Sequence, residues 1–421
     1  MSEWKKVKLG EICERVTSGG TPKANVSSYY NPPTIPWLKT KEVNYCRITE
    51  TENYISEEGF NNSSAKLIAP NSVIIAMYGQ GDTAGRVAIN KIPLTTNQAC
   101  CNLTINKDKA DYEFIYYQLC TLYNKMVSLK AGAAQPNLNA QIIKNLDILL
   151  PTLIIQHRIA AILSRYDTLI ENYQKQIKLL EEAAQRLYKE WFVDLRFPGH
   201  ENTKIVDGVP EGWEKKPISQ LGEYLNGFAF KPSDWQESGK PIIKIKEMGN
   251  GVSNDTPRNN GERVPAKYLV KAGDLLFSWS ATLMVIVWSG EEGWLNQHLF
   301  KVTPAKRIGR EFLLQSISNT IEEFQNLTTG STMKHIQRNK LDQVFVNVPD
   351  DEIMEAYNNI AENERVEILH LSSQIRLLTE ARDRLLPKLM SGEISVETAQ
   401  SVTSGLGVRK EQTGSPKPSD S

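Results

Sequence analysis

The chain repeats itself with a period near 200 residues, and this duplication constrains its fold more than any other feature. Pro151 and Pro349 lie 198 positions apart, and each ends a short alternation of apolar and polar residues, the pattern of a half-buried strand. The same offset relates the apolar residues beyond each proline, Ile155, Ile162, Ile170, Ile177, Leu180 and Leu187, to Ile353, Ile360, Ile368, Ile375, Leu378 and Leu385. The sequence therefore predicts two copies of one unit, each made of a lobe followed by a helix.

The apolar residues that follow each lobe recur every seven positions, the spacing of a coiled-coil stripe. In the first copy, two such sets are Ile159, Tyr166, Tyr173, Leu180 and Leu187, with Leu163, Ile170, Ile177, Ala184 and Trp191. Each helix covers about 40 residues and would be roughly 60 Å long. Because a lobe returns the chain between the helices, we expect them to pair with each other in antiparallel orientation. A homodimeric coiled coil is the alternative.

Each lobe is predicted to mix short strands with helices. Alternating segments at 73–78 and 274–279 indicate strands, and the segments at 113–128 and 310–327 indicate helices. The predicted class is α+β with a pseudo-twofold internal repeat. Its parts are a first lobe at 1–151, a first spacer helix at 152–197, a second lobe at 198–349, a second spacer helix at 350–392 and a largely disordered tail at 393–421.

The composition excludes several classes of protein. Hydrophobic residues make up 40% and charged residues 23% of the chain, as in a globular protein. The most apolar stretch, residues 146–155, is interrupted by Pro151 and is too short to cross a bilayer. The first residues lack the apolar run of a signal peptide. We therefore expect a cytoplasmic protein, and the spacing of its five cysteines and five histidines predicts no disulfide and no metal site.

No catalytic constellation stands out in the sequence. The run Asn31-Pro32-Pro33-Thr34 resembles the Asn-Pro-Pro-aromatic motif of adenine amino-methyltransferases, but Thr34 provides no ring to stack on a flipped base. A glycine-rich loop suited to a nucleotide cofactor is also missing, since Gly79-Gln80-Gly81 is only a weak candidate. We expect no catalytic residue and no cofactor in this chain, and a methyltransferase or nuclease acting alone is disfavoured.

The net charge of the chain is zero, and its distribution gives only a small positive excess outside the second helix. The two lobes carry +3 and +1, the first helix +1, and residues 350–421 carry −5. Charge alone would hold such a protein weakly on DNA. Binding to DNA would need local patches, or a partner that supplies phosphate contacts.

Several short motifs resemble the DNA-specificity subunits of Type I restriction–modification systems. The motifs that resemble a target-recognition domain are Leu9-Gly10-Glu11-Ile12, Thr17-Ser18-Gly19-Gly20-Thr21-Pro22 and Ile35-Pro36-Trp37-Leu38-Lys39. Those that resemble the spacer helices are Gln156-His157-Arg158-Ile159-Ala160 and Arg384-Leu385-Leu386-Pro387-Lys388-Leu389-Met390-Ser391-Gly392-Glu393-Ile394. The resemblance covers the whole chain except the tail.

The resemblance implies that this chain determines which DNA sequence a larger complex acts on. Each lobe would recognise one half of a bipartite, asymmetric site on double-stranded DNA, and the paired helices would set the gap between the halves. Two methyltransferase subunits would carry S-adenosylmethionine, and two motor-nuclease subunits would use ATP and Mg. A coiled-coil adaptor that binds only protein is the alternative, although it leaves two diverged lobes unexplained.

Base recognition calls for polar or planar side chains on loops of the lobes. In the first lobe the candidates are Lys39, Lys41, Tyr78, Gln80, Thr83, Arg86, Gln135, Asn137 and Asn139. In the second lobe they are Lys244, Lys246, Trp279, Ser280, Thr282, Lys334, His335, Gln337 and Arg338. The second lobe departs from the family motifs, with Asn226-Gly227-Phe228 and Ile242-Ile243-Lys244, so no residue role carries over to it. Any one candidate could equally be a solvated loop residue.

Two further groups of residues recur or stand out. Asn97-Gln98 and Asn296-Gln297 recur in both copies, which favours a shared structural or phosphate-binding role over sequence recognition. Trp191, Phe192 and Trp294 could anchor a partner, but packing in the core is the more common fate of such side chains.

Overall fold

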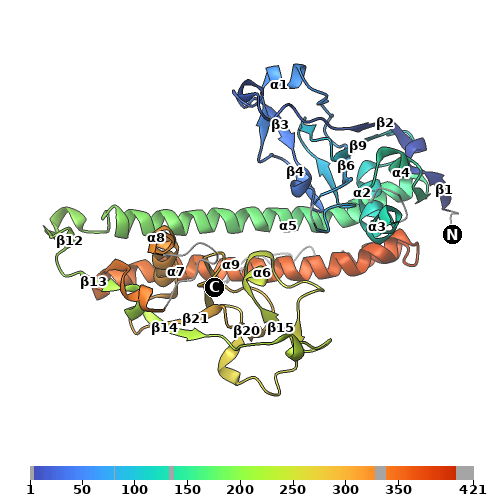
Figure 1. Ribbon diagram of the computed structural model, residues 1–421. Coiled ribbons are helices and arrows are strands. Elements are labelled where there is room, and N and C mark those ends of the chain that lie inside the picture. Colours follow the sequence, from blue (N-terminus) through green and yellow to red (C-terminus); the bar gives the residue numbers. More distant parts are fainter. Residues whose placement is uncertain (1–3, 80, 132–136, 328–337, 404–421) are drawn as a thin grey trace, which may run out of the picture. The chain divides into compact units, whose positions relative to one another are not determined.

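The computed structural model describes residues 4–79, 81–131, 137–327 and 338–403, which form two compact units (Figure 1). The first unit contains residues 1–168 and 379–421, and the second contains residues 169–378. Each unit therefore holds one lobe together with one end of each long helix. The mixed α+β lobes and the long helices confirm the predicted fold class.

The two long helices are α5 (Leu153–Tyr188), which continues into a π-helical turn (Lys189–Val193), and α9 (Asp351–Met390). Each helix follows a strand that ends at one of the two equivalent prolines, β10 (Asp147–Leu150) before Pro151 and β22 (Phe345–Val348) before Pro349. Proline suits this position because it has no N–H for a strand ladder and its φ is already helical. The first helix is shorter than predicted, because regular helix ends at residue 188 and the π-helical turn at residue 193.

The helices pair in antiparallel orientation, as their contacts inside each unit demonstrate. In the first unit the guanidinium of Arg382, near the end of α9, lies 2.6 Å from the carboxylate of Asp167 on α5. In the second unit the opposite ends meet, since the ring of Tyr357 lies 6.0 Å from that of Trp191 and 6.5 Å from that of Tyr188. The predicted antiparallel pairing is confirmed.

The two lobes share one sheet topology. The main sheet of the first lobe has the order β2-β9-β6-β7-β4, and that of the second has the order β14-β21-β18-β19. The strands of the first are β2 (Cys13–Ser18), β9 (Cys100–Ile105), β6 (Val73–Ala76), β7 (Val87–Asn90) and β4 (Cys46–Ile48). Those of the second are β14 (Gly222–Asn226), β21 (Leu299–Pro304), β18 (Leu275–Ser278) and β19 (Met284–Val287). Four strands thus correspond in order, and the first lobe adds β4 at the edge, parallel to β7.

Smaller sheets repeat as well. In the first lobe they comprise β3 (Ile35–Leu38), β5 (Tyr54–Ile55) and β8 (Thr95–Thr96), and the pair β1 (Lys5–Lys8) with β10. In the second lobe they comprise β15 (Lys240–Ile243), β16 (Arg258–Asn259), β17 (Leu269–Val270) and β20 (Gly293–Leu295), the pair β13 (Glu214–Pro217) with β22, and the hairpin of β11 (Ile205–Val206) with β12 (Val209–Pro210). The parallel pairs β3–β8 and β15–β20 occupy equivalent places.

Short helices complete each lobe. They are α1 (Glu57–Asn61), α2 (Tyr112–Thr121), α3 (Tyr123–Ala131) and α4 (Ala140–Lys144) in the first lobe, and α6 (Ile245–Asn250), α7 (Arg310–Asn319) and α8 (Ile321–Leu327) in the second. Helix α2 packs against β6 and β7, and α7 packs against β19 and β21. No helix among the described residues is long and apolar enough to cross a membrane.

The predicted tail is partly ordered. Within the predicted tail, residues Val396–Thr403 form α10. Ser395 caps the helix by accepting a hydrogen bond from the main-chain N–H of Thr398 at 3.2 Å, and Val396 and Ala399 are buried. The serine and threonine content that suggested disorder also provides helix caps. Residues 404–421 lie outside the described part of the chain.

An aromatic cluster forms the core of the second unit. Phe192 lies 4.9 Å, between ring centroids, from both Phe312 of α7 and Tyr357 of α9, in edge-to-face arrangements. Trp191 is buried beside it, and Trp294 is buried elsewhere in the lobe with its indole N–H donated to the carbonyl of Asn259 at 3.0 Å. The expectation that these tryptophans and Phe192 pack in the core is confirmed.

Truncation of Phe312 tests the importance of this cluster. The ring is fully buried, so we expect Phe312→Ala to lower the free energy of unfolding by about 3–5 kcal/mol, because it removes apolar contacts and leaves a cavity. Urea unfolding of the full chain measures the loss. Phe345→Ala is the control, since that ring is 46% exposed and its removal should cost less than about 0.5 kcal/mol. Equal losses would show that the cluster is not the centre of the core.

Candidate nucleic-acid interface

Equivalent hairpins present half of the described candidate side chains. Strands β6 and β7 form the hairpin of the first lobe, with Ile74 opposite Ala88, and β18 and β19 form that of the second, with Leu276 opposite Ile286. The loop of each hairpin begins with an aromatic residue one or two positions after the strand, Tyr78 in the first and Trp279 in the second. The duplication therefore places two different side chains at matching positions.

In the first lobe, contacts of the hairpin loop define a first candidate surface, made of residues 44–45, 78–79, 81–86, 123 and 137–139. The main-chain N–H of Leu138 donates to the carbonyl of Met77 at 3.2 Å. The hydroxyl of Tyr123 donates to the carbonyl of Asp82 at 2.9 Å. The predicted residues Tyr78, Thr83, Arg86, Asn137 and Asn139 all belong to this surface.

The predicted residues of this surface differ in how firmly they are held. The Arg86 guanidinium donates to Asp82 at 2.6 Å and to Asn44 at 2.9 Å, which orients its planar group. The side-chain oxygen of Asn139 caps α4 by accepting from the N–H of Ile142 at 2.9 Å. Arg86 is thus positioned for a bidentate contact to a base or a phosphate, whereas Asn139 has a structural role as well.

Four of the five predicted lysines belong to the described residues, and each has a partner within its own lobe. The Lys39 ammonium lies 2.9 Å from Asn53 Oδ1 and 5.0 Å from the centroid of the Trp37 ring, and Lys41 pairs with Glu52. In the second lobe the Lys244 ammonium lies 5.3 Å from the centroid of the Trp235 ring, and Lys246 pairs with Asp255. Each lobe thus has one lysine over a tryptophan ring and one lysine paired with a carboxylate.

These contacts recur because both lobes use the same turn. The main-chain N–H of Lys39 donates to Glu42 at 2.9 Å, and that of Lys244 donates to Glu247 at 3.1 Å. Hydrogen bonds from Lys246 and Ser253 lower the pKa of Asp255 to about 2, so this carboxylate stays charged. The lysines are therefore held in place at this turn, and each ammonium has three N–H donors, so a contact to phosphate does not require the loss of these partners.

In the second lobe, four side chains define a second candidate surface, made of Asn226, Trp279, Gln297 and His298. The indole N–H of Trp279 donates to Asn226 at 3.2 Å, and its ring lies 5.7 Å from that of His298. The Gln297 amide lies 3.3 Å from His298 Nε2. An indole, an imidazole and amides side by side offer both a flat apolar face and hydrogen-bonding groups, which suits the edges of bases.

Two other predicted residues lie in the hairpin loop of the second lobe. Ser280 is only 3% exposed, so its hydroxyl is not presented at the surface of this chain. Thr282 is exposed, and its carbonyl accepts a hydrogen bond from the Ser278 hydroxyl. Thr282 remains a candidate, whereas Ser280 would need the loop to move.

Some candidates cannot be placed. Gln80, Gln135, Lys334, His335 and Gln337 lie outside the described residues. Arg338 begins a 3₁₀ turn (Arg338–Asp342), but only its main chain belongs to the described part.

The recurring Asn-Gln pairs make equivalent main-chain contacts in the two lobes, and the shared role of their side chains stays a prediction. The main-chain N–H of Asn97 donates to the carbonyl of Leu38 at 2.9 Å, and that of Asn296 donates to Ile243 at 3.1 Å. Both bonds join the small sheet of a lobe to the turn that precedes an inner strand of its main sheet, β9 in the first lobe and β21 in the second. The residue two positions after each asparagine differs, and this position holds His298 in the second lobe, which sequence reasoning missed. The sequence signal that could have identified His298 was the difference between the two lobes at this position, directly after the Asn-Gln pair that both lobes share.

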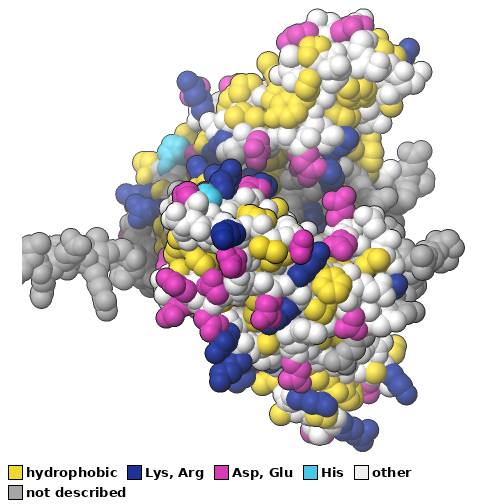
Figure 2. Space-filling view, turned by 90° about the vertical axis from the view of Figure 1, so that its left-hand side faces the viewer, with side chains coloured by type: hydrophobic (Ala, Val, Ile, Leu, Met, Phe, Trp, Pro, Cys, Tyr) yellow, Lys and Arg dark blue, Asp and Glu magenta, His cyan; other side chains and the backbone are white. Residues whose placement is uncertain are grey.

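The charges on one face of the molecule agree with the balanced sequence. On the face shown in Figure 2, Lys and Arg side chains are interspersed with Asp and Glu rather than gathered by sign. The described residues contain no group of three or more His, Cys, Asp and Glu side chains that could hold a metal ion. Recognition by geometry of individual side chains fits this surface better than attraction by a strongly basic patch.

Comparison with known proteins gives two matches to one family model. Residues 1–182 and 210–382 match the Type I restriction modification DNA specificity domain. The chain is 27% identical over 419 residues to the Type I restriction enzyme MjaIX specificity subunit of Methanocaldococcus jannaschii, with 94% of each chain covered. It is 22% identical over 474 residues to the HindI specificity subunit of Haemophilus influenzae, covering 94% of this chain and 100% of that one.

A solved structure supports the same fold. The S subunit of a Type I restriction-modification system from M. genitalium superposes with a TM-score of 0.54 at 15% identity, covering 92% of this chain and 96% of that one. The two matches to the family model together span most of the sequence and coincide with the two copies of the repeat. The chain therefore belongs to the Type I restriction modification DNA specificity family, and its function is sequence-specific recognition of DNA.

Proposed function

We propose that each lobe recognises one half of a bipartite, asymmetric DNA site and that the paired helices set the gap between the halves. One observation carries this proposal: the two lobes share a topology but present different side chains at equivalent hairpins. Tyr78 and Arg86 belong to the first candidate surface, and Trp279 and His298 belong to the second. A duplicated scaffold with unlike surfaces would recognise two unlike half-sites.

The helices suit the role of a spacer. Helix α9 contains 40 residues and α5 contains 36, so they are roughly 60 and 54 Å long at 1.5 Å per residue. Two half-sites on one face of the duplex lie a turn of about 34–36 Å apart, or a multiple of it. Antiparallel pairing stiffens both helices, and a stiff spacer would reject sites with the wrong gap.

The chain would act inside a complex in the cytoplasm. We propose that it contributes no catalytic group and binds two methyltransferase subunits, which hold S-adenosylmethionine. For restriction, two motor-nuclease subunits that use ATP and Mg would join. The support is the chain's family and its nearly balanced charge, which leaves much of the affinity for phosphates to partners.

Methylome sequencing tests the proposal as a whole. The chain is co-expressed with the methyltransferase subunit of its system, and methylated positions are compared with those of a strain lacking the chain. We expect a split, asymmetric motif with N6-methyladenine in both halves that disappears when the chain is absent. If the complex forms but no motif depends on the chain, recognition of DNA by its lobes is wrong and a protein adaptor is favoured.

Substitutions in the second candidate surface test which lobe recognises which half. We expect Trp279→Ala and His298→Ala each to weaken binding to the intact site by about 5–150-fold, because a good base contact is worth about 1–3 kcal/mol. Binding is measured with the methyltransferase complex on duplexes in which one half-site is altered at a time.

The control for this experiment is Phe345→Ala, which removes a ring of the same lobe that is 46% exposed and lies outside the second candidate surface. It should leave the affinity unchanged within about twofold. The loss in the two test variants should concern one half-site only. A uniform loss with a lower melting temperature would instead assign Trp279 to the stability of the lobe.

A further inference from the structure

We propose that a pair of charge-reversed ion pairs assigns each lobe to its own helix. Asp167 on α5 and Arg365 on α9 lie 198 positions apart, so they occupy the same place in the two copies of the repeat. Both are buried, with exposures of 6% and 5%. Their charges are opposite, and each meets the opposite charge on its own lobe.

In the first unit the helix supplies the acid and the lobe supplies the base. Arg47 of β4 donates from Nη1 to Asp167 Oδ2 at 3.1 Å, and the hydroxyl of Tyr117 on α2 donates to the same oxygen. The other oxygen, Oδ1, accepts from Arg382 of α9 at 2.6 Å. Every partner of this carboxylate is a donor, so the site is built for a negative charge on the helix.

In the second unit the signs are exchanged. Arg365 of α9 donates from Nε to Glu311 Oε2 at 2.8 Å and from Nη2 to Oε1 at 3.1 Å, a bidentate pair with the lobe helix α7. Glu311 is fully buried, and it also accepts from the Gln315 amide at 2.7 Å. Here the site is built for a positive charge on the long helix.

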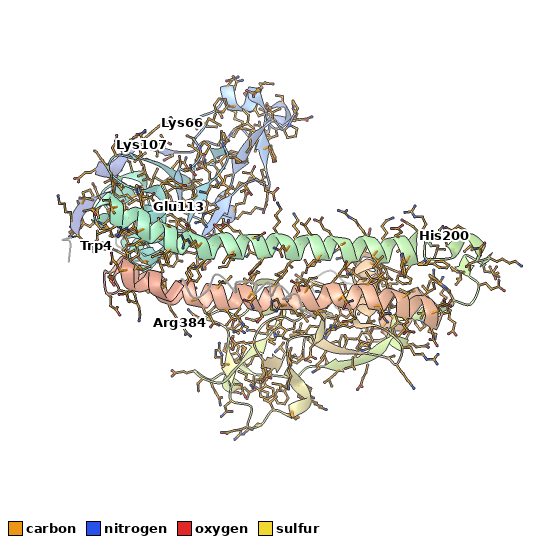
Figure 3. The ribbon with its side chains drawn as sticks, turned by 180° about the vertical axis from the view of Figure 1, so that it is seen from behind. Trp4, Lys66, Lys107, Glu113, His200 and Arg384 are labelled. Atoms are coloured by element: carbon orange, nitrogen blue, oxygen red, sulfur yellow. The ribbon has the colours of Figure 1, made fainter. Side chains whose placement is uncertain are left out.

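The reversal arises from one added strand. Glu113 is the equivalent of Glu311, and Figure 3 shows it where the first lobe meets α5. In the first lobe, however, Arg47 lies next to Glu113, with Nε 3.6 Å from Oε1. Arg47 belongs to β4, the strand that pairs with β7. In the described part of the second lobe no strand pairs with the equivalent β19 on that side. Glu311 therefore faces its long helix directly.

A lobe placed on the other helix would meet a like charge. The second lobe on α5 would bring Glu311 toward Asp167, and the first lobe on α9 would bring Arg47 toward Arg365. A buried charge without an opposite partner costs several times more than an exposed ion pair contributes. Equivalent sites with reversed charges thus favour one assignment of lobes to helices, and this holds whatever sequence the lobes recognise.

Charge reversal within the natural chain is the first test. We expect Glu311→Arg and Arg365→Glu each to lower the melting temperature by roughly 5–15 °C, because each leaves two like charges buried together. Glu311→Arg combined with Arg365→Glu should recover at least half of that loss. The matched control is the exposed pair Lys240 and Glu292, whose single reversals should shift the melting temperature by less than about 2 °C.

Exchange of a lobe is the second test, and it addresses assignment directly. Residues 1–151 are replaced by residues 198–349, which puts the second lobe on both helices. A matched chimaera adds Asp167→Arg and Arg382→Ala, which introduces the residues found at the equivalent positions 365 and 184 of the second unit. We expect the matched chimaera to melt roughly 5–15 °C above the unmatched one.

The outcomes separate clearly. If a single reversal yields no folded chain, recovery of soluble, folded protein by the double reversal supports the proposal. A double reversal that stays unfolded, while the neutral pair Glu311→Gln with Arg365→Gln folds, overturns it. Equal melting temperatures of the two chimaeras also overturn it. None of these results depends on DNA binding, so they leave the proposed function to its own test.

Discussion

The antiparallel pairing of α5 and α9 is the interaction on which the rest of the structure depends. Neither helix could leave its heptad stripe exposed to water, and each unit encloses one end of both. In the second unit the ends meet in an aromatic cluster built around Phe192, Phe312 and Tyr357. In the first unit they meet beside Asp167, which binds Arg382 of the opposite helix. The lobes are therefore attached to a helix pair rather than to single helices.

Duplication of one lobe gives two surfaces that share a scaffold and differ in chemistry. The corresponding strand orders β2-β9-β6-β7 and β14-β21-β18-β19 keep the hairpins in equivalent places, and the main-chain bonds of Asn97 and Asn296 keep the adjoining turns alike. Side chains outside these fixed bonds were free to diverge, as Tyr78 and Trp279 did. Binding of DNA by such a chain rests on this contrast between a constant main chain and variable loop residues.

Charged residues fall into two groups, those whose partners repeat in both lobes and those whose charge is reversed between the two copies. Lys39, Lys41, Lys244 and Lys246 repeat in both lobes with aromatic or acidic neighbours of their own. The buried charges at positions 167 and 365 do not repeat in sign. The lysines near the surface thus keep the same charge in both copies, whereas the buried residue where each lobe meets its helix has the opposite charge in the other copy.

The sequence by itself determined the duplication, the antiparallel helices, the strands that end at Pro151 and Pro349, and the positions of the hairpins, because these depend on periodicity and on local backbone chemistry. It also indicated Trp191 and Phe192 as core residues. Only the tertiary structure showed that Arg47 reaches Asp167, that His298 joins Trp279, and that residues after 395 form a helix. These contacts join residues distant in the sequence, or depend on burial by another element, and no local pattern records which distant neighbour a side chain will meet.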